Sequence, residues 1–199
     1  RAVSGPVAET VAIEKTKTPS RFDIYAKVRL SADLSHLSDN QREMIGLLIA
    51  AAKVTDEIFW LQVWGNKNEL LNSIDDPKAR QFADYNYGPW DRLDADKPFI
   101  AEYGERPKGA RFYPSDMSKE EFDAWEQEGK DGLYSIVTRN AQGELTLVSY
   151  NDAYADQISK ISGLLIEAAA LADDPEFANY LSMRAAALTS GDYQASDMA

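Results

Sequence analysis

One long helical pattern constrains the fold of this chain more than any other feature of its sequence. Ser38 and Gln41 have the spacing of a capping box, in which each side chain binds a backbone N–H group of the first helical turn. Helical spacing of apolar residues continues from there to Trp64, and Gly65 follows where a left-handed end is favoured. We therefore predict a central helix from Ser38 to Trp64. Its apolar stripe consists of Met44, Leu47, Leu48, Ala51, Thr55, Ile58, Phe59 and Gln62, widened by Ile45, Ile49 and Ala52.

Two tryptophans stand on the polar side of this helix pattern. Lys53 and Glu57 mark the side that should face solvent. Trp60 and Trp64 continue the same stripe, so two large apolar side chains need a cover from another segment. The nearest aromatic segment is the stretch over residues 85–114. We expect it to cover both indoles by ordinary core packing.

The stretch from Tyr85 to Pro114 combines aromatic and charged residues with many glycines and prolines. This density of residues that break helices and strands predicts a long loop. Ordered loops of this length usually carry function or are packed down by their own side chains. Asp91 beside Arg92 can hold a ligand or pin the loop through charge-assisted hydrogen bonds, and pinning is the more frequent use. The candidates for substrate contact are Tyr87, Trp90, Asp91, Arg92, Phe112 and Tyr113.

The remaining patterns predict shorter helices and one β-hairpin. Helices are expected over residues 68–74, 77–85, 118–129, 152–172 and 175–190, and strands over residues 21–30, 133–139 and 144–150. Asp174 and Pro175 restart a helix after a very short connection, which predicts an antiparallel helical hairpin. The fold class is therefore α+β and mostly helical, with a long central helix, a C-terminal antiparallel helical hairpin and a small antiparallel β-sheet.

The expected domain organisation is simple. Residues 1–20 mix small, polar and proline residues without a period, and we expect them to form an extended lead-in. We expect residues 21–199 to form a single domain, because no polar, glycine-rich linker divides them. The segment after Gly191 stops without a helix cap or a charged tail, which suggests a fragment.

Composition excludes several classes of partner and site. The chain has 199 residues and a formal net charge of -12, which opposes binding to nucleic acid because phosphates need clustered Lys and Arg. It has no cysteine, so disulfides, thiol catalysis and thiolate metal sites are excluded. No apolar run has the length of a membrane span, and the first residues show no signal-peptide pattern. We expect a periplasmic or cell-envelope location before a cytoplasmic one.

Motifs for metal or nucleophilic catalysis are missing. A catalytic zinc site needs three protein ligands, commonly including His-Glu-x-x-His, and the one histidine, His36, is interpreted as a structural residue. The Gly-x-Ser-x-Gly, P-loop and Gly-x-Gly-x-x-Gly patterns do not occur. Asp91, Asp94 and Asp96 lack the glycine and the terminal Glu of a calcium hand, so a solvated turn is favoured over a calcium site. The sequence predicts no catalytic residue and no metal ligand.

Four segments carry a resemblance to a known family. They are residues 32–38, 87–93, 112–117 and 192–198, and the most specific is Tyr87-Gly88-Pro89-Trp90-Asp91-Arg92-Leu93. These segments resemble the N-terminal region of bacterial dipeptidyl peptidase III-like zinc metallopeptidases. The resemblance covers almost all of the chain after Ser20. Ala195 departs from the family pattern, which has proline there.

The resemblance implies a function for a larger protein. The His-Glu-x-x-His zinc helix of the family lies downstream of the region that this chain resembles. The chain is therefore expected to be the N-terminal, non-catalytic lobe of a two-lobed peptidase, inactive alone, with zinc and the catalytic residues in the missing C-terminal lobe. Its partners would be that C-terminal lobe and a peptide substrate in the cleft between the lobes. The alternative is a free-standing acidic helical binding module that docks a protein or a glycan through the same loop.

Overall fold

The computed structural model of the chain describes residues 20–199, and the chain divides into two compact units, residues 1–30 and 31–199. The expected lead-in over residues 1–20 lies, except for Ser20, outside the described residues. The described part of the first unit begins with one turn of 3-10 helix, η1 (Arg21–Asp23), and continues as irregular chain to Leu30.

The strand expected over residues 21–30 is wrong. The Asp23 N–H donates to the Ser20 carbonyl at 2.9 Å, which turns the chain at the start of the expected strand. Val28 and Leu30, which should have pointed into a core, are exposed. Alternation makes a strand only where a neighbouring strand and a core cover one face. Within the described part of their unit, residues 24–30 have no neighbouring strand, and they stay irregular.

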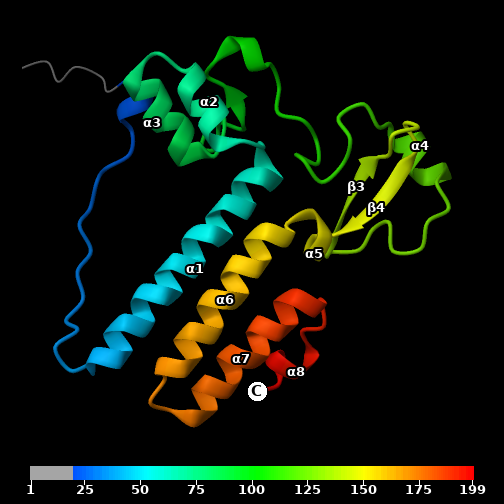
Figure 1. The fold of residues 1–199 in the computed structure, drawn as a ribbon. Coiled ribbons are helices and arrows are strands. Elements are labelled where there is room, and N and C mark those ends of the chain that lie inside the picture. The colour runs from blue at the N-terminus through cyan, green and yellow to red at the C-terminus, as the bar shows by residue number, and fades with distance from the viewer. Residues whose placement is uncertain (1–19) are drawn as a thin grey trace, which may run out of the picture. The chain divides into compact units, whose positions relative to one another are not determined.

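The long helix, α1 (Asp39–Val63), forms as the sequence predicts. The Ser38 side chain accepts from the Gln41 N–H, and the Gln41 side chain accepts from the Ser38 N–H, so the capping box is complete. At the other end the N–H groups of Trp64 and Gly65 both donate to the Trp60 carbonyl. Figure 1 shows α1 as a long helix drawn in cyan.

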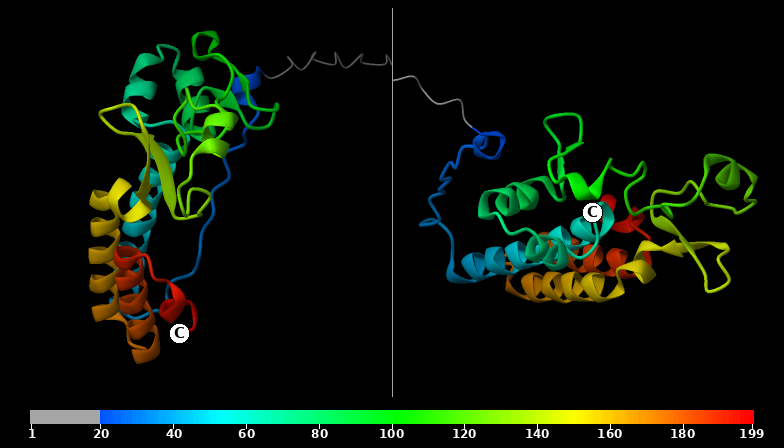
Figure 2. Two further views of the ribbon diagram at one scale, coloured as in Figure 1. Left: turned by 90° about the vertical axis from the view of Figure 1, so that its right-hand side faces the viewer. Right: turned by 90° about the horizontal axis from the view of Figure 1, so that it is seen from above.

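Three helices lie side by side and form the main core. The middle one is α6 (Ala155–Leu171), which contacts α1 on one side and α7 (Pro175–Ser190) on the other (Figures 1 and 2). Small side chains let α6 and α7 approach closely, and the Ser162 hydroxyl donates to the Ala185 carbonyl at 3.1 Å. The expected helical hairpin is confirmed. The buried core of the three helices consists of Ala51, Ile161, Leu165, Ala168, Leu181 and Ala185.

A second group of elements lies at the C-terminal end of α1. The helices α2 (Lys67–Ser73) and α3 (Pro77–Asn86) begin at the side-chain caps Asn66 and Asp76. The long loop follows, and it contains more structure than expected. Two-residue strands pair within it, β1 (Trp90–Asp91) with β2 (Lys97–Pro98), before the 3-10 turn η2 (Ala101–Tyr103).

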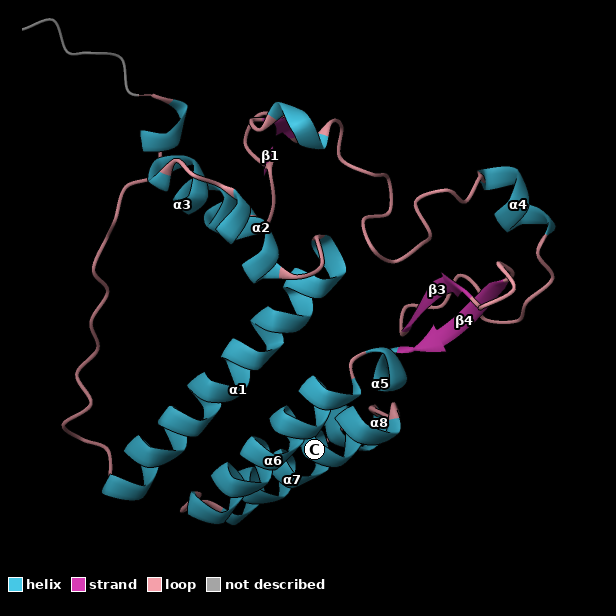
Figure 3. Cartoon of the chain, turned by 45° about the horizontal axis from the view of Figure 1, so that its top comes forward, coloured by secondary structure: helices cyan, strands magenta, loops and turns pink. Residues whose placement is uncertain are grey.

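The last group is the predicted β-hairpin with its neighbours. The strands β3 (Ser135–Arg139) and β4 (Leu145–Ser149) pair antiparallel, and Gly143 turns the chain between them with φ +82° (Figure 3). Short helices accompany the hairpin: α4 (Lys119–Ala124), α5 (Tyr150–Ala153) and α8 (Gln194–Asp197). The mostly helical α+β class is confirmed. No helix among residues 20–199 has the length and apolar character to cross a membrane.

Three details differ from the expectations. The helix expected over residues 118–129 ends at Ala124, where Trp125 takes an extended conformation and the Lys130 ammonium donates to the Phe122 and Trp125 carbonyls. Its capping box is half formed: Ser118 accepts from the Glu121 N–H, while the Glu121 carboxylate binds Arg139 at 2.8 Å. The helix expected over residues 152–172 is interrupted at Tyr154, which leaves α-helical geometry and separates α5 from α6. The sequence also gave no signal for α8.

Candidate functional site

Tyr87 fastens the start of the long loop to α1. It adopts the left-handed conformation, φ +55°, at the end of α3, and its side chain lies on α1. Its hydroxyl donates to the Asp56 carboxylate at 2.5 Å. Its ring lies 4.7 Å from the ring of Phe59, edge to face, and 5.2 Å from that of Trp60. Tyr87 therefore holds the loop in place on α1.

Trp90 anchors the middle of the loop. Its side chain is 5% exposed, and the indole N–H donates to the Gly104 carbonyl at 2.9 Å. Its ring lies 5.4 Å from the ring of Trp64, which also packs edge to face against Tyr103 at 5.1 Å. The loop thus covers the exposed end of α1, as the two tryptophans in the polar stripe had predicted.

Asp91 is buried beside Trp90, and it stabilises the turn that follows. The residue is 3% exposed, and its carboxylate accepts from the Leu93 N–H at 3.0 Å. Its backbone carbonyl accepts from the N–H groups of Asp94 and Asp96. Arg92 is exposed, with its guanidinium carbon 6.0 Å from the centre of the Tyr87 ring. Asp91 therefore has a structural role in the turn, whereas Arg92 lies at the surface.

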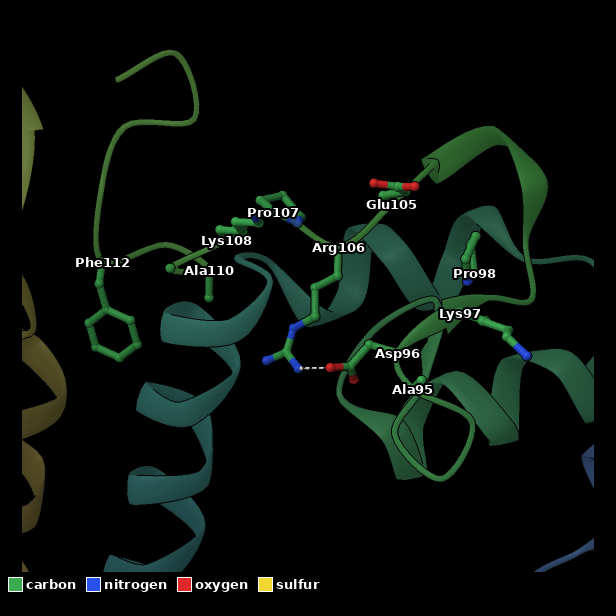
Figure 4. A pocket seen from close by; sticks show the side chains of 11 residues that line it. Ala95, Asp96, Lys97, Pro98, Glu105, Arg106, Pro107, Lys108, Ala110 and Phe112 are labelled. Atoms are coloured by element: carbon green, nitrogen blue, oxygen red, sulfur yellow. Dashed lines mark hydrogen bonds and ion pairs between the residues drawn. The ribbon is translucent and has the colours of Figure 1, made fainter. Parts of the chain in front are cut away.

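The three neighbouring carboxylates do not converge on one point. Asp94 pairs with Lys97 at 3.0 Å, and Asp96 pairs with Arg106 at 2.9 Å. Figure 4 shows the second pair in a cavity beside the loop, with the Arg106 guanidinium extended toward Asp96. His36 lies exposed in a turn before α1. In the part of the chain that the structure describes, no three His, Asp or Glu side chains come together as metal ligands. Within residues 20–199, the side chains do not fit a zinc site.

Phe112 and Tyr113 connect the loop to the β-hairpin. The Phe112 carbonyl accepts from the Val137 N–H at 2.9 Å, so the loop pairs with the outer edge of β3. The Phe112 ring lies 6.4 Å from that of Tyr150. The Tyr113 ring packs edge to face against Phe122 at 5.7 Å. Both aromatic side chains remain half-buried, and each keeps surface that a ligand can contact.

Two cavities lie on either side of the segment over residues 105–111. The first, of about 620 Å³, is the one in Figure 4, and its lining combines charged side chains with alanine, proline, glycine and phenylalanine. The second, of about 520 Å³, lies between the end of α1, the loop and β3; we call it the aromatic cleft. Pro107 and Ala110 line both. The aromatic cleft is lined by Val63, Trp64, Trp90, Tyr103, Pro107, Ala110, Arg111, Tyr113, Pro114, Ser115, Asp116, Val137, Thr138 and Arg139.

Of the six candidates from the sequence, the aromatic cleft includes Trp90 and Tyr113. Phe112 lines the first cavity, and Tyr87 and Arg92 line neither of these two. The sequence reasoning missed the contributions of β3 and of the charged rim. Trp64 had been noted as an aromatic that needs a cover, and this was a usable signal. Nothing in the local pattern placed Arg139 there, because Arg139 reaches the cleft through the pairing of β3 with the loop.

Arg139 supplies a fixed positive charge at the rim of the aromatic cleft. Its guanidinium binds both carboxylate oxygens of Glu121, one oxygen of Asp116 and the Gly143 carbonyl. The hydrogen bonds that Arg139 donates to Glu121 are the main reason why the pKa of Arg139 is raised, and the same bonds lower the pKa of Glu121. Arg111 is held in turn, since its guanidinium donates to the Trp64 carbonyl at 2.5 Å. The cleft therefore combines aromatic walls with oriented charges.

Gly109 allows the loop to pass close to Tyr113. Its φ is +81°, and a Cβ atom there would lie 2.8 Å from the Tyr113 ring. We expect Gly109→Ala to destabilise the chain by about 1–3 kcal/mol, since it adds left-handed strain and a steric clash. Gly143→Ala is the matched control, because Gly143 has φ +82° and nothing within 4 Å of its Cβ position. Urea unfolding of both variants measures the difference, and equal losses would show that the Tyr113 contact contributes nothing.

The bond between Tyr87 and Asp56 predicts a pH dependence of stability. The pKa of Tyr87 is raised from 10.0 to about 12. The hydrogen bond to Asp56 makes the largest contribution, followed by burial and by the charges of Asp56 and Asp84. A raised pKa means that the folded state holds the proton more tightly. The stabilisation is therefore fully present below pH 10 and is lost as the pH rises through about 12.

We expect the stability difference between the wild type and Tyr87→Phe to shrink between pH 10 and pH 12. Burial also raises the pKa values of Tyr150, Tyr154 and Tyr193, but these residues are present in both proteins and cancel in the comparison. Denaturant unfolding at a series of pH values measures the effect. A stability difference that stays constant over this range would contradict it.

The chain is similar in sequence and fold to two solved structures. No family model matches the chain. In the solved structure of DPP III from Caldithrix abyssi, 35% of the aligned residues are identical, with a TM-score of 0.74 over 84% of this chain and 34% of that chain. Dipeptidyl-peptidase III from Corallococcus sp. strain EGB is 32% identical, with a TM-score of 0.81 over 87% of this chain and 35% of that chain.

A curated plant protein is similar as well. Nudix hydrolase 3 from Arabidopsis thaliana is 26% identical over 88% of this chain and 31% of its own length. The chain thus spans about a third of the length of each of these three proteins. A match of this extent does not assign the activity of any of them to this chain. The two solved structures share both sequence and fold with it, which confirms the family resemblance noted in the sequence. Over most of its length, the chain is similar in sequence and fold to about a third of each of these two solved dipeptidyl-peptidase III proteins.

Proposed function

We propose that this chain is the N-terminal, substrate-cleft lobe of a dipeptidyl peptidase III-like zinc metallopeptidase. The observation that carries the proposal is the match to two bacterial dipeptidyl-peptidase III structures, at 32–35% identity and with TM-scores of 0.74–0.81. In this proposal the zinc and the catalytic groups belong to a C-terminal lobe that the chain lacks. The chain alone is then inactive as a peptidase. A periplasmic or cell-envelope location stays a prediction.

The aromatic cleft is the proposed surface for the peptide. Its volume of about 520 Å³ fits within the usual range of ligand sites, roughly 300–1,000 Å³. The half-buried Tyr113 offers a face for an apolar side chain, and Arg111 and Asp116 place opposite charges at the rim. Trp90 and Asp91 are buried, and they act by shaping the loop. Arg92, Tyr87 and Phe112 remain candidates for contact with more distant parts of the substrate.

The test compares peptidase activity in the longer protein and in this chain. We expect the longer protein to cleave dipeptides from the N-terminus of a peptide, to lose that activity with a zinc chelator, and to regain it with zinc. The 199-residue chain should show no cleavage. Activity that survives the chelator, or a longer protein without a His-Glu-x-x-His motif, would overturn the proposal.

The role of the aromatic cleft is tested by one substitution in the longer protein. We expect Tyr113→Ala to lower kcat/KM by about tenfold to a hundredfold, a loss of roughly 1.4–2.8 kcal/mol of transition-state stabilisation. Tyr134→Ala is the control, because Tyr134 is an exposed tyrosine that does not line the cleft. Equal activity of the Tyr113→Ala protein and the wild type would place the peptide elsewhere.

The alternative is a free-standing acidic binding module that uses the same loop to dock a protein or a glycan. Its support is that the aromatic cleft is formed entirely by residues of this chain. The native gene distinguishes the two readings. A stop codon directly after the codon for Ala199 would favour the module and exclude the peptidase lobe.

A further inference from the structure

Arg111 is the charged residue of the aromatic cleft that has no charged partner in the described part of the chain. The lining contains three charged side chains, Arg111, Asp116 and Arg139. Arg139 forms ion pairs with Asp116 at 2.9 Å and with Glu121 at 2.8 Å. Four of its five N–H groups are engaged, because it also donates to the Gly143 carbonyl. Arg139 therefore has little capacity left for a ligand.

The backbone and the side chain of Arg111 are both held against the end of α1. Its backbone N–H donates to the Gln62 carbonyl at 3.0 Å, and its Nε–H donates to the Trp64 carbonyl at 2.5 Å. These bonds satisfy two carbonyl groups at the end of the helix. A Cβ atom at Gly65 would lie 3.7 Å from Nη2 of Arg111, so the guanidinium lies close to this helix end. The side chain is therefore oriented before a ligand binds.

The outer end of the Arg111 guanidinium remains available. A guanidinium has five N–H groups, and the Nε–H of Arg111 is the one that binds the helix end. The N–H groups on Nη1 and Nη2 have no hydrogen-bond partner among residues 20–199. They form a planar fork that matches the two oxygens of a carboxylate. Capping α1 requires a single donor, so the fold does not account for this fork.

Aromatic and apolar surfaces lie in the same cleft as this fork. The lining includes the half-buried rings of Trp64, Tyr103 and Tyr113, together with Pro107 and Pro114. These surfaces can hold an apolar side chain, and the water that it displaces strengthens the pairing of a nearby charge. The net charge of -12 opposes an acidic ligand, but salt at physiological strength screens exposed charges beyond about 8 Å. The nearby guanidinium therefore outweighs the distant negative charges.

We propose that Arg111 makes the aromatic cleft selective for peptides with a carboxylate beside an apolar side chain. The carboxylate binds Nη1 and Nη2, and the apolar side chain lies against the aromatic rings. An acidic side chain and the C-terminus of a short peptide offer the same chemistry, so either can supply the carboxylate. This inference rests on the proposed function, because it takes a peptide as the ligand of the cleft. Arg111 then determines specificity and takes no part in the chemical step.

Peptide binding to the 199-residue chain is a direct test, because every residue of the cleft belongs to this chain. The probes are pentapeptides of the form Ala-Leu-x-Tyr-Ala, with glutamate or glutamine at x and a carboxylate or an amide at the C-terminus. Titration calorimetry gives the dissociation constant of each of the four. We expect the glutamine peptide amide to bind about tenfold or more weakly than the tightest of the others. The position whose neutralisation weakens binding most identifies the source of the carboxylate.

Three variants assign the preference to Arg111. Arg111→Gln should bind all four peptides with similar affinity, and Arg111→Lys should keep a reduced preference, because an ammonium keeps the charge and lacks the fork. Lys160→Gln is the control, since Lys160 is an exposed cation on α6 that does not line the cleft, and it should keep the full preference. Circular dichroism of each variant reports whether the fold is retained. The comparison between peptides within one variant separates recognition from a uniform loss of structure.

Several results would overturn the inference. These are equal affinities of the wild type for the four peptides, no binding of any of them, and a preference that survives in Arg111→Gln. A preference lost equally in Lys160→Gln would show a response to net charge instead of recognition by Arg111. If Arg111→Gln does not fold, Arg111→Lys decides, and an undiminished preference in that variant would exclude the fork.

The binding assay requires neither zinc nor cleavage, so it separates this inference from the proposed function. A carboxylate preference that depends on Arg111, in a chain whose longer protein shows no chelator-sensitive peptidase activity, would overturn the peptidase and support the recognition. Chelator-sensitive activity of the longer protein, together with equal affinities for the four peptides, would overturn the recognition and leave the peptidase lobe intact.

Discussion

Replacing Trp90 with alanine is expected to lower the free energy of unfolding by about 3–5 kcal/mol, the range for deleting a large buried aromatic side chain. The indole is 5% exposed, it packs on Trp64, and its N–H group donates to the Gly104 carbonyl. The substitution therefore removes packing and a hydrogen bond that together fix the loop. Denaturant unfolding followed by circular dichroism measures the loss.

Arg92→Ala is the matched control from the same loop. Arg92 is exposed, so its replacement should change stability by no more than about 0.5 kcal/mol. Trp90→Phe should fall between the two, because the ring is kept in part while the bond to Gly104 is lost. If Arg92→Ala unfolds the chain and Trp90→Ala leaves it intact, the structural and surface roles of these two residues are reversed.

Replacing Trp60 with alanine should have an effect of the same size, about 3–5 kcal/mol. Trp60 is 2% exposed, its ring lies 5.2 Å from that of Tyr87, and the Lys67 ammonium lies 5.2 Å from its centre. The substitution opens a cavity where the loop, α1 and α2 meet. Its effect should extend to the loop, because Tyr87 loses one of the two rings that hold it.

The two tryptophans should differ when phenylalanine replaces them. Among the described residues, the buried Trp60 indole N–H has no hydrogen-bond partner, whereas that of Trp90 is bonded. A buried unpaired donor costs about 1–3 kcal/mol, so Trp60→Phe removes an unfavourable group together with favourable packing. We expect Trp60→Phe to be milder than Trp90→Phe in the same unfolding assay. The reverse order would show that packing of the larger ring outweighs the unpaired donor at position 60.

These expectations divide the six candidates by physical role. Trp90 and Asp91 are buried, and they determine where the loop lies. Tyr87 fastens it to α1 through Asp56. Tyr113 is both partly exposed and part of the aromatic cleft, which makes it the candidate whose loss should change activity more than stability.

Local sequence signals determined most of the secondary structure. The capping box at Ser38, the cap at Asp76 and the turn at Gly143 all act through hydrogen bonds or φ angles within a few residues, so the chain near them needs no distant partner. The same holds for the helix that restarts at Pro175. The length of α1 and its wide apolar stripe also predicted, correctly, a central helix packed against others.

Tertiary structure decided the features that depend on distant partners. Residues 24–30 alternate like a strand but remain irregular, because no sheet edge reaches them in the described structure of their unit. The Glu121 side chain binds Arg139, which lies 18 positions further along the chain, instead of closing the capping box of α4. A charge-assisted pair of this kind outweighs a local cap, and its partner is not visible in the local pattern.

The aromatic cleft was decided in the same way. The sequence by itself determined that an aromatic loop covers the end of α1, because unburied tryptophans require it. Tyr113 lines the same cleft as Trp64, Thr138 and Arg139. Two backbone hydrogen bonds hold the loop there, from the Val137 N–H to the Phe112 carbonyl and from the Arg111 N–H to the Gln62 carbonyl, and no periodicity encodes them. A backbone hydrogen bond between distant segments carries no side-chain signature, so the arrangement of the cleft is a property of the folded chain alone.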